Sequence, residues 1–269
     1  MRQKKIKLYV LAFMAFLLIL TAVFADKICP YDPYAQDLSI SYQAPSAAHL
    51  MGTDAYGRDM LSRVIIGARV SILSTLALVM CIAVFGTVIG LICGFYNGVA
   101  DMLLMRISDV CLAFPGLVFA LAVAAILGGG IWGAVIALAV ISWPKYARVA
   151  RGLTLSIKDS SYVAAARLSG DKNYQLIYRH ILPNIIGPVL VTATLDIGTM
   201  MMELAGLSFL GLGAQPPVAE WGSMMSNGRS LLQTYPWVVL SPGFAIFITV
   251  VVFNLFGDAL RDVYDPKGR

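Results

Sequence analysis

Long apolar segments without charged residues are the feature that most limits what this 269-residue chain can fold into. A segment of about 20 such residues crosses a bilayer as a helix, because a helix satisfies its own backbone hydrogen bonds without water. Only 13% of the residues are charged, whereas about a quarter are charged in soluble domains. We therefore expect an all-α integral membrane protein with six transmembrane helices.

The apolar segments divide the chain into spans and their connections. We expect a cytoplasmic N-terminus at 1–7, a first span at 8–25, an extracytoplasmic loop at 26–69, a five-span core at 70–257 and a cytoplasmic tail at 258–269. The core spans are expected at 70–94, 103–127, 131–150, 185–207 and 237–257, with a cytoplasmic loop at 156–184. The first span is longer than the roughly 7–15 residues of a signal-peptide core. We expect it to be retained, with cleavage after Ala25 as the alternative.

The distribution of Lys and Arg predicts that both termini lie in the cytoplasm. With the N-terminus inside, fifteen Lys and Arg fall on the inner side and five on the outer side. The inner count includes Lys145, Arg148 and Arg151. Such an excess is typical of the cytoplasmic side of membrane proteins. The net charge of +5 therefore gives no reason to expect a nucleic-acid partner.

Glycine spacing marks a close helix contact and a turn. Gly86, Gly90 and Gly94 recur every fourth residue in the second span, which favours close approach of another helix. Glycine is also common in membrane helices in general, which is the plainer interpretation. The three consecutive glycines at 128–130 predict a tight turn between two spans.

A polar stretch interrupts the apolar segments on the predicted cytoplasmic side. Between Ser161 and Arg179 an Ala-rich run favours a helix, Gly170 ends it, and a second short helix is expected to begin near Lys172. Such a helix–Gly–helix can project from the membrane into a groove of a soluble partner. A solvated loop with incidental Ala content is the alternative.

This stretch resembles the cytoplasmic coupling loop of ABC-importer permeases. The shared pattern is an Ala-Ala pair, a Gly four residues later and a terminal Leu-Pro, although Ala164 replaces the usual acid and His180 replaces a hydrophobic residue. The resemblance implies the fold of a type I ABC-importer transmembrane domain. It also implies that the following residues contact an ATPase subunit: Tyr162, Ala165, Ala166, Arg167, Gly170, His180, Leu182 and Pro183.

The outer loop contains a compact group of charges. Asp54, Arg58 and Asp59 are expected to form a local ion-pair cluster that orders the loop or holds a docking binding protein. A metal site formed by the two acids is the alternative. The run from residue 49 to Ser71 resembles the permeases that import peptides and nickel.

Two acids lie inside the predicted fifth span. Asp196 and Glu203 are seven residues apart and therefore share one helical face. Each costs roughly 2.5–3.5 kcal/mol at a helix centre, so both are expected to face protein or water rather than lipid. With Thr199 and Met200 they are predicted to line the translocation path. Local capping or pairing of Glu203 is the alternative.

The resemblance covers nearly the whole chain and suggests a cargo. The run 195–201 and the Ala-Glu-Trp-Gly at 219–222 resemble nickel permeases, whereas Ser-Phe-Leu-Gly-Leu-Gly and Gln-Pro-Pro are shared with peptide permeases. We predict translocation of nickel, free or chelated, by alternating access. An importer of di- or oligopeptides is the alternative.

The resemblance implies partners rather than catalysis by this chain. It implies a second homologous permease subunit, two ATP-binding subunits and an extracytoplasmic solute-binding protein. The chain has no G-x-x-x-x-G-K-[ST] loop, so ATP and Mg are expected on the partner subunits and no cofactor on this one. An ion-coupled secondary transporter using the two intramembrane acids is a more distant alternative. An intramembrane protease is not supported, because His49 and His180 are predicted on opposite sides of the membrane.

Overall fold

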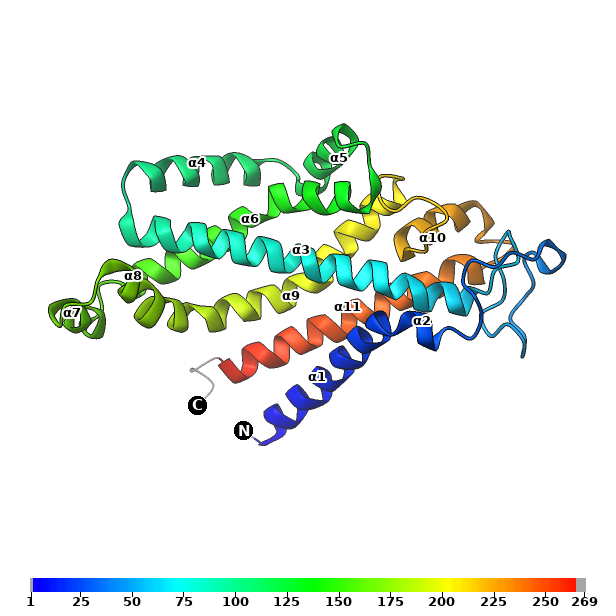
Figure 1. Cartoon of the computed structure of the whole chain (residues 1–269), viewed down its shortest axis with the longest axis horizontal. Helices are drawn as coiled ribbons and strands as arrows, with labels where there is room; N and C mark the ends of the chain where they lie inside the picture. Colours follow the sequence, from blue (N-terminus) through cyan, green and yellow to red (C-terminus); the bar gives the residue numbers. More distant parts are fainter. Residues whose placement is uncertain (1, 265–269) are drawn as a thin grey trace.

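Five long helices lie side by side along the long axis of the molecule (Figure 1). The structure is a computed structural model that describes residues 2–264. The five helices are long and apolar enough to cross a membrane. They are α1 (Arg2–Val23), α3 (Met60–Tyr96), α6 (Gly130–Ile157), α9 (Leu182–Phe209) and α11 (Trp237–Tyr264). The predicted all-α class is confirmed.

Shorter elements connect these helices. They are α2 (Ala25–Ile28), η1 (Leu38–Ile40), α4 (Val99–Ala113), α5 (Gly116–Ile126), α7 (Ser161–Leu168), α8 (Asn173–Gln175), η2 (Leu176–Ile181), α10 (Trp221–Gly228) and η3 (Arg229–Leu231). Two of them, α4 and α5, lie along one side of the bundle (Figure 1). The ends of the described chain and α7 lie toward one end of the bundle, and α10 lies toward the other (Figure 1). Which end faces the cytoplasm stays a prediction.

Helices α3 and α6 approach each other closely through the predicted glycines. A Cβ at Gly86 would lie 2.6 Å from the Cβ of Tyr146, and a Cβ at Gly94 would lie 2.8 Å from the Cβ of Thr154. Real Cβ atoms do not come so close. The expectation that this stripe admits a neighbouring helix is therefore confirmed.

The expected single span at 103–127 is instead two helices. Helices α4 and α5 meet at a bend of 97°. Pro115 follows Phe114, whose backbone is extended, and a residue before proline is disfavoured in the helical region. The 11 residues of α5 give a length of about 16 Å, well short of the roughly 30 Å hydrocarbon core. The segment can cross a membrane only if the bent pair acts together.

Helix α3 begins at Met60 rather than at the expected residue 70. The Asp59 carboxylate accepts hydrogen bonds from the backbone N–H and the hydroxyl of Ser62, both at 2.8 Å. Aspartate at this position satisfies N–H groups that have no partner within the helix. The last part of the expected outer loop is therefore the first turns of α3.

Two ion pairs fasten α4 to α6. The Arg151 guanidinium donates to both carboxylate oxygens of Asp101, at 2.6 and 2.7 Å. Arg148 lies one turn before Arg151 on the same face of α6, and it pairs with Asp109 at 2.5 Å. The sequence predicts both arginines on the cytoplasmic side, and the structure adds that they hold α4 against α6.

The glycine stripe yields a test of the fold. Gly86→Val should destabilise the protein by about 1–3 kcal/mol, because the added methyl groups meet the backbone of α6. Gly152→Ala is the matched control: it lies on α6 and its added Cβ has no neighbour within 4 Å. Thermal unfolding of the purified proteins in detergent measures both. Equal stability of Gly86→Val and wild type would contradict this account of the contact.

Candidate functional site

The hairpin at 158–183 has the helix–Gly–helix form that the sequence predicts. Helix α7 ends just before Gly170, whose φ is +98°. No atom lies within 4 Å of a Cβ added there, so the glycine is required by backbone conformation rather than by crowding. Helix α8 and η2 then return the chain to α9.

The base of this hairpin is packed onto the bundle. Ile181 is buried in a cluster with Leu91 of α3 and Ala150 of α6. His180 Nε2 lies 2.9 Å from Asp171 Oδ2, which ties η2 to the turn after α7. The hairpin is therefore held in place by its second half.

Both halves of the hairpin also expose apolar side chains to solvent. Leu168 is 90% exposed at the end of α7, and Tyr174 and Tyr178 are also exposed. Exposed apolar side chains gathered on a projecting segment are typical of a surface that binds another protein. Of the predicted coupling residues, Tyr162, Ala165, Arg167, Gly170 and Pro183 are exposed, while Ala166, His180 and Leu182 are half-buried.

An ion pair lies halfway along the bundle. The Lys145 ammonium of α6 contacts the carboxylate of Asp196 on α9, and each residue is near the middle of its helix. The Asp196 side chain is only 4% exposed, whereas that of Lys145 is 52% exposed. The sequence count places Lys145 on the cytoplasmic side, which stays a prediction, and the structure adds that this cation pairs with Asp196 of another helix.

The remaining path residues do not all share one environment. Glu203 is half-buried on the face of α9 that carries Asp196, and Thr199 is exposed. Met200 is buried in the main hydrophobic cluster, so its thioether faces protein rather than an aqueous path. In the described part of the chain, the Tyr146 hydroxyl and Asp196 Oδ2 are buried without a hydrogen-bond partner.

Two arginines share one carboxylate at the other end of the bundle. Arg58 Nε donates to Asp54 Oδ2 at 2.7 Å, and Arg63 Nε lies 3.5 Å from the same oxygen. The expected third member was Asp59, but this residue caps α3 and contacts His49 Nδ1 at 2.9 Å. Arg63 takes its place because the helix begins early enough to bring that side chain back to the loop.

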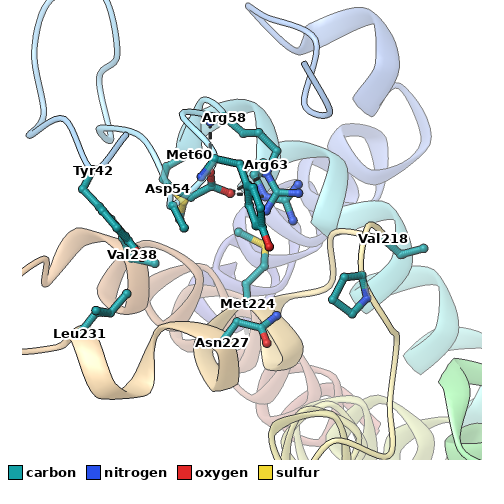
Figure 2. Close-up of a pocket in the computed structure, with 13 residues that line it drawn as sticks. Tyr42, Asp54, Arg58, Met60, Arg63, Val218, Met224, Asn227, Leu231 and Val238 are labelled. Carbon is teal, nitrogen blue, oxygen red and sulfur yellow. Dashed lines mark hydrogen bonds and ion pairs between the residues drawn. The ribbon is translucent and has the colours of Figure 1, made fainter. Parts of the chain in front are cut away.

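These charges line a cavity of about 280 Å³ (Figure 2). Its wall is formed by the outer loop and the start of α3 on one side and by residues around α10 and the start of α11 on the other. The alternative of a metal site has no support here, since no group of three or more His, Cys, Asp or Glu side chains within 2–264 is arranged to hold a metal ion.

Two distant sequence motifs meet between α3 and α10. The Ser71 hydroxyl donates to the buried carboxylate of Glu220 at 3.2 Å and accepts from the N–H of Trp221 at 3.1 Å. The Trp221 indole donates to the carbonyl of Val64 at 2.9 Å. Glu220 also caps α10, so these motifs hold the part of the cavity wall that α10 forms.

Sequence reasoning missed three residues at these sites. Lys145 is the first of three closely spaced cations, with Arg148 and Arg151, and no sequence signal marks it as the partner of Asp196. Arg63 lies in the run from residue 49 to Ser71 that resembles peptide and nickel permeases, but its partner depends on where α3 begins. Tyr146 has no sequence signal beyond its position next to Lys145.

Comparison with known proteins gives consistent similarities. Residues 86–269 match the family described as "Binding-protein-dependent transport system inner membrane component". The chain is 44% identical over 249 residues to the dipeptide transport system permease protein DppC of Alkalihalophilus pseudofirmus, covering 93% of this chain and 82% of that protein. It is 44% identical over 252 residues to the glutathione transport system permease protein GsiD of Pectobacterium atrosepticum, covering 93% and 84%. It is also 44% identical over 251 residues to the probable D,D-dipeptide transport system permease protein DdpC of Escherichia coli, again covering 93% and 84%.

Solved structures share the fold at lower identity. An inward-facing structure of the MetNI methionine ABC transporter matches with a TM-score of 0.57 at 20% identity, covering 77% of this chain and 98% of that one. An amino acid ABC transporter with histidines matches with a TM-score of 0.51 at 20% identity, covering 74% and 92%. At these identities the likeness shows the fold alone.

The mid-bundle ion pair yields a stability test. Lys145→Met should destabilise the protein by about 1–3 kcal/mol, because the buried Asp196 carboxylate loses its ammonium partner. Lys145→Met combined with Asp196→Leu should recover most of that loss, since an apolar pair leaves no charge unpaired. Thermal unfolding in detergent measures both variants. A single variant as stable as wild type would show that the pair adds nothing to folding.

Proposed function

Because the chain belongs to the family of binding-protein-dependent transport system inner membrane components, we propose that it carries short peptides as the permease subunit of an ATP-driven importer. Membership makes it a multi-pass membrane protein and a transport component rather than an enzyme. It also means that the chain works with an ATPase and a solute-binding protein. The expected fold of a type I ABC-importer transmembrane domain is confirmed.

The relatives favour a peptide over nickel as cargo. Three permeases named for dipeptides, glutathione and D,D-dipeptides are each 44% identical to this chain over 93% of its length. The nickel interpretation depended on few residues, those of the run 195–201, which includes Asp196 and Met200, and those at 219–222. Lys145 already neutralises the Asp196 carboxylate, and Met200 is buried in the core. The alternative of an ion-coupled secondary transporter has no support from these relatives.

The polar face between α6 and α9 supports a path for a zwitterionic cargo. The exposed Lys145 side chain lies on α6 directly after its uncharged apolar part, where a charge facing lipid would be costly. This face therefore meets water or another protein chain. Glu203 and Thr199 extend the same polar face along α9. A peptide with two charged ends can pass such a face without losing all of its polar contacts.

The hairpin supports the proposed coupling to ATP hydrolysis. Its packed base lies against α3 and α6, and α7, which ends in the exposed Leu168, lies beyond the ends of those helices (Figure 1). A partner that binds α7 can move α3 and α6, because the base of the hairpin is packed against both helices. ATP can drive the change only by binding one conformation of the assembly more tightly than the other.

The proposed assembly has the subunits that the family resemblance implies. The hairpin and both termini face the cytoplasm, where two ATPase subunits hold ATP and Mg. This chain holds no cofactor of its own. A second, homologous permease covers the polar face of α6 and α9, and a solute-binding protein delivers cargo at the end that carries α10.

Uptake by whole cells tests the cargo. In a strain that lacks only this chain, restoring it should restore accumulation of radiolabelled alanyl-alanine and leave accumulation of radiolabelled nickel unchanged. The reverse pattern would overturn the peptide proposal in favour of nickel.

Binding of the ATPase tests the hairpin. Leu168→Asp should weaken co-purification of the ATPase subunit about tenfold or more, because a charge then enters an apolar contact. Leu38→Asp is the matched control, since Leu38 is also exposed but belongs to the outer loop. Both variants should reach the membrane in normal amounts. Unchanged co-purification of Leu168→Asp would contradict the proposed role of the hairpin.

A further inference from the structure

The cavity at the outer end of the bundle carries one unbalanced positive charge. Of the 13 residues that line it, Arg58 and Arg63 are basic and Asp54 alone is acidic. All three side chains are largely buried. The wall therefore attracts an anion, because one carboxylate cannot neutralise two guanidinium groups.

Most hydrogen-bond donors of the two guanidiniums remain available. An arginine side chain has five N–H donors. Within 2–264, the recorded hydrogen bonds use Arg58 Nε, on Asp54, and Arg63 Nη1, which donates to the carbonyl of Pro33 at 3.2 Å. Apart from Arg63 Nε, which faces Asp54, the other N–H groups of these two cavity-lining side chains have no protein partner within the described residues. Paired N–H groups in a planar fork match the geometry of a carboxylate.

The arginines are held in place before any ligand arrives. The ring of Tyr56 lies under the Arg58 guanidinium, 4.6 Å from its centroid. Asp54 is itself fixed, because its second oxygen, Oδ1, accepts from the backbone N–H groups of Tyr56 and Arg58 at 2.8 and 3.1 Å. A ligand that binds here does not have to order the side chains that receive it.

The rest of the wall suits the remainder of a small organic molecule. Met60, Met224, Leu231 and Val238 contribute apolar surface, and Asn227 adds an amide (Figure 2). The cavity volume of about 280 Å³ is at the lower limit of the roughly 300–1,000 Å³ of small-molecule sites. It therefore fits one end of a peptide rather than a long peptide.

We propose that this cavity is a carboxylate-binding site in which Arg58 and Arg63 receive the C-terminal carboxylate of the cargo peptide as it leaves the solute-binding protein. The identity of the cargo rests on the proposed function. An acidic side chain of the solute-binding protein presents the same chemistry, and the experiment separates the two sources.

The test uses the complete transporter in proteoliposomes with its solute-binding protein. The probes are radiolabelled alanyl-alanine and its C-terminal amide, which lacks the carboxylate. Arg63→Lys keeps the charge but loses the planar fork, and it should lower the ratio of acid uptake to amide uptake about tenfold. Arg229→Gln is the matched control, because Arg229 is exposed and does not line the cavity.

A second measurement identifies the source of the carboxylate. The Kd of the peptide-free solute-binding protein for the transporter should be unchanged in Arg63→Lys if the carboxylate belongs to the cargo. A Kd raised about tenfold, with the uptake ratio unchanged, would support the same site but assign the carboxylate to the binding protein.

Two outcomes overturn the proposal. One is an Arg63→Lys variant with the wild-type uptake ratio and the wild-type Kd. The other is an equal fall in uptake of the acid and the amide with an unchanged Kd, which would make Arg63 a structural residue. If wild-type transporter takes up neither probe, the proposed cargo fails instead, and the Kd measurement still tests the site.

Discussion

The close contact between α3 and α6 is the constraint on which the other sites depend. Small residues along α3 let the two helix backbones approach, and this fixes the position of α6. Helix α6 then carries Lys145 to α9 and Arg151 to α4. The base of the hairpin rests against the same two helices. A change in the angle between α3 and α6 would therefore alter the mid-bundle pair and the hairpin together.

Charge pairing between helices is the second theme of the structure. A charge at the centre of a span is tolerated when it faces a partner or water. Lys145 pairs with Asp196 between two long helices, and Arg58 pairs with Asp54 in the loop that precedes α3. The two sites differ in balance, since the first pair is neutral and Arg63 leaves the second with a surplus. In the proposed function, this difference would separate a path along which cargo moves from a site that binds it.

Features set by local rules could be predicted from the sequence, and features set by distant partners could not. The helix break at Gly170 and the glycine stripe follow from backbone geometry alone. The bend at Pro115 had the same kind of signal and was missed because apolar length was given more weight. The contact between Lys145 and Asp196 joins residues 51 positions apart, and no local pattern specifies it. Likewise, Arg63 rather than the expected Asp59 joins Asp54 and Arg58, and this depends on which residue begins α3.

The mid-bundle ion pair has a consequence for how the chain is made. Each charge alone adds roughly 2.5–3.5 kcal/mol to the insertion of its span, and 51 residues of synthesis separate the two. Helix α6 therefore enters lipid at a disadvantage until α9 emerges and supplies the carboxylate. We expect α6 to remain beside the translocon during that interval, so that membrane insertion and tertiary folding of these two helices occur as one event.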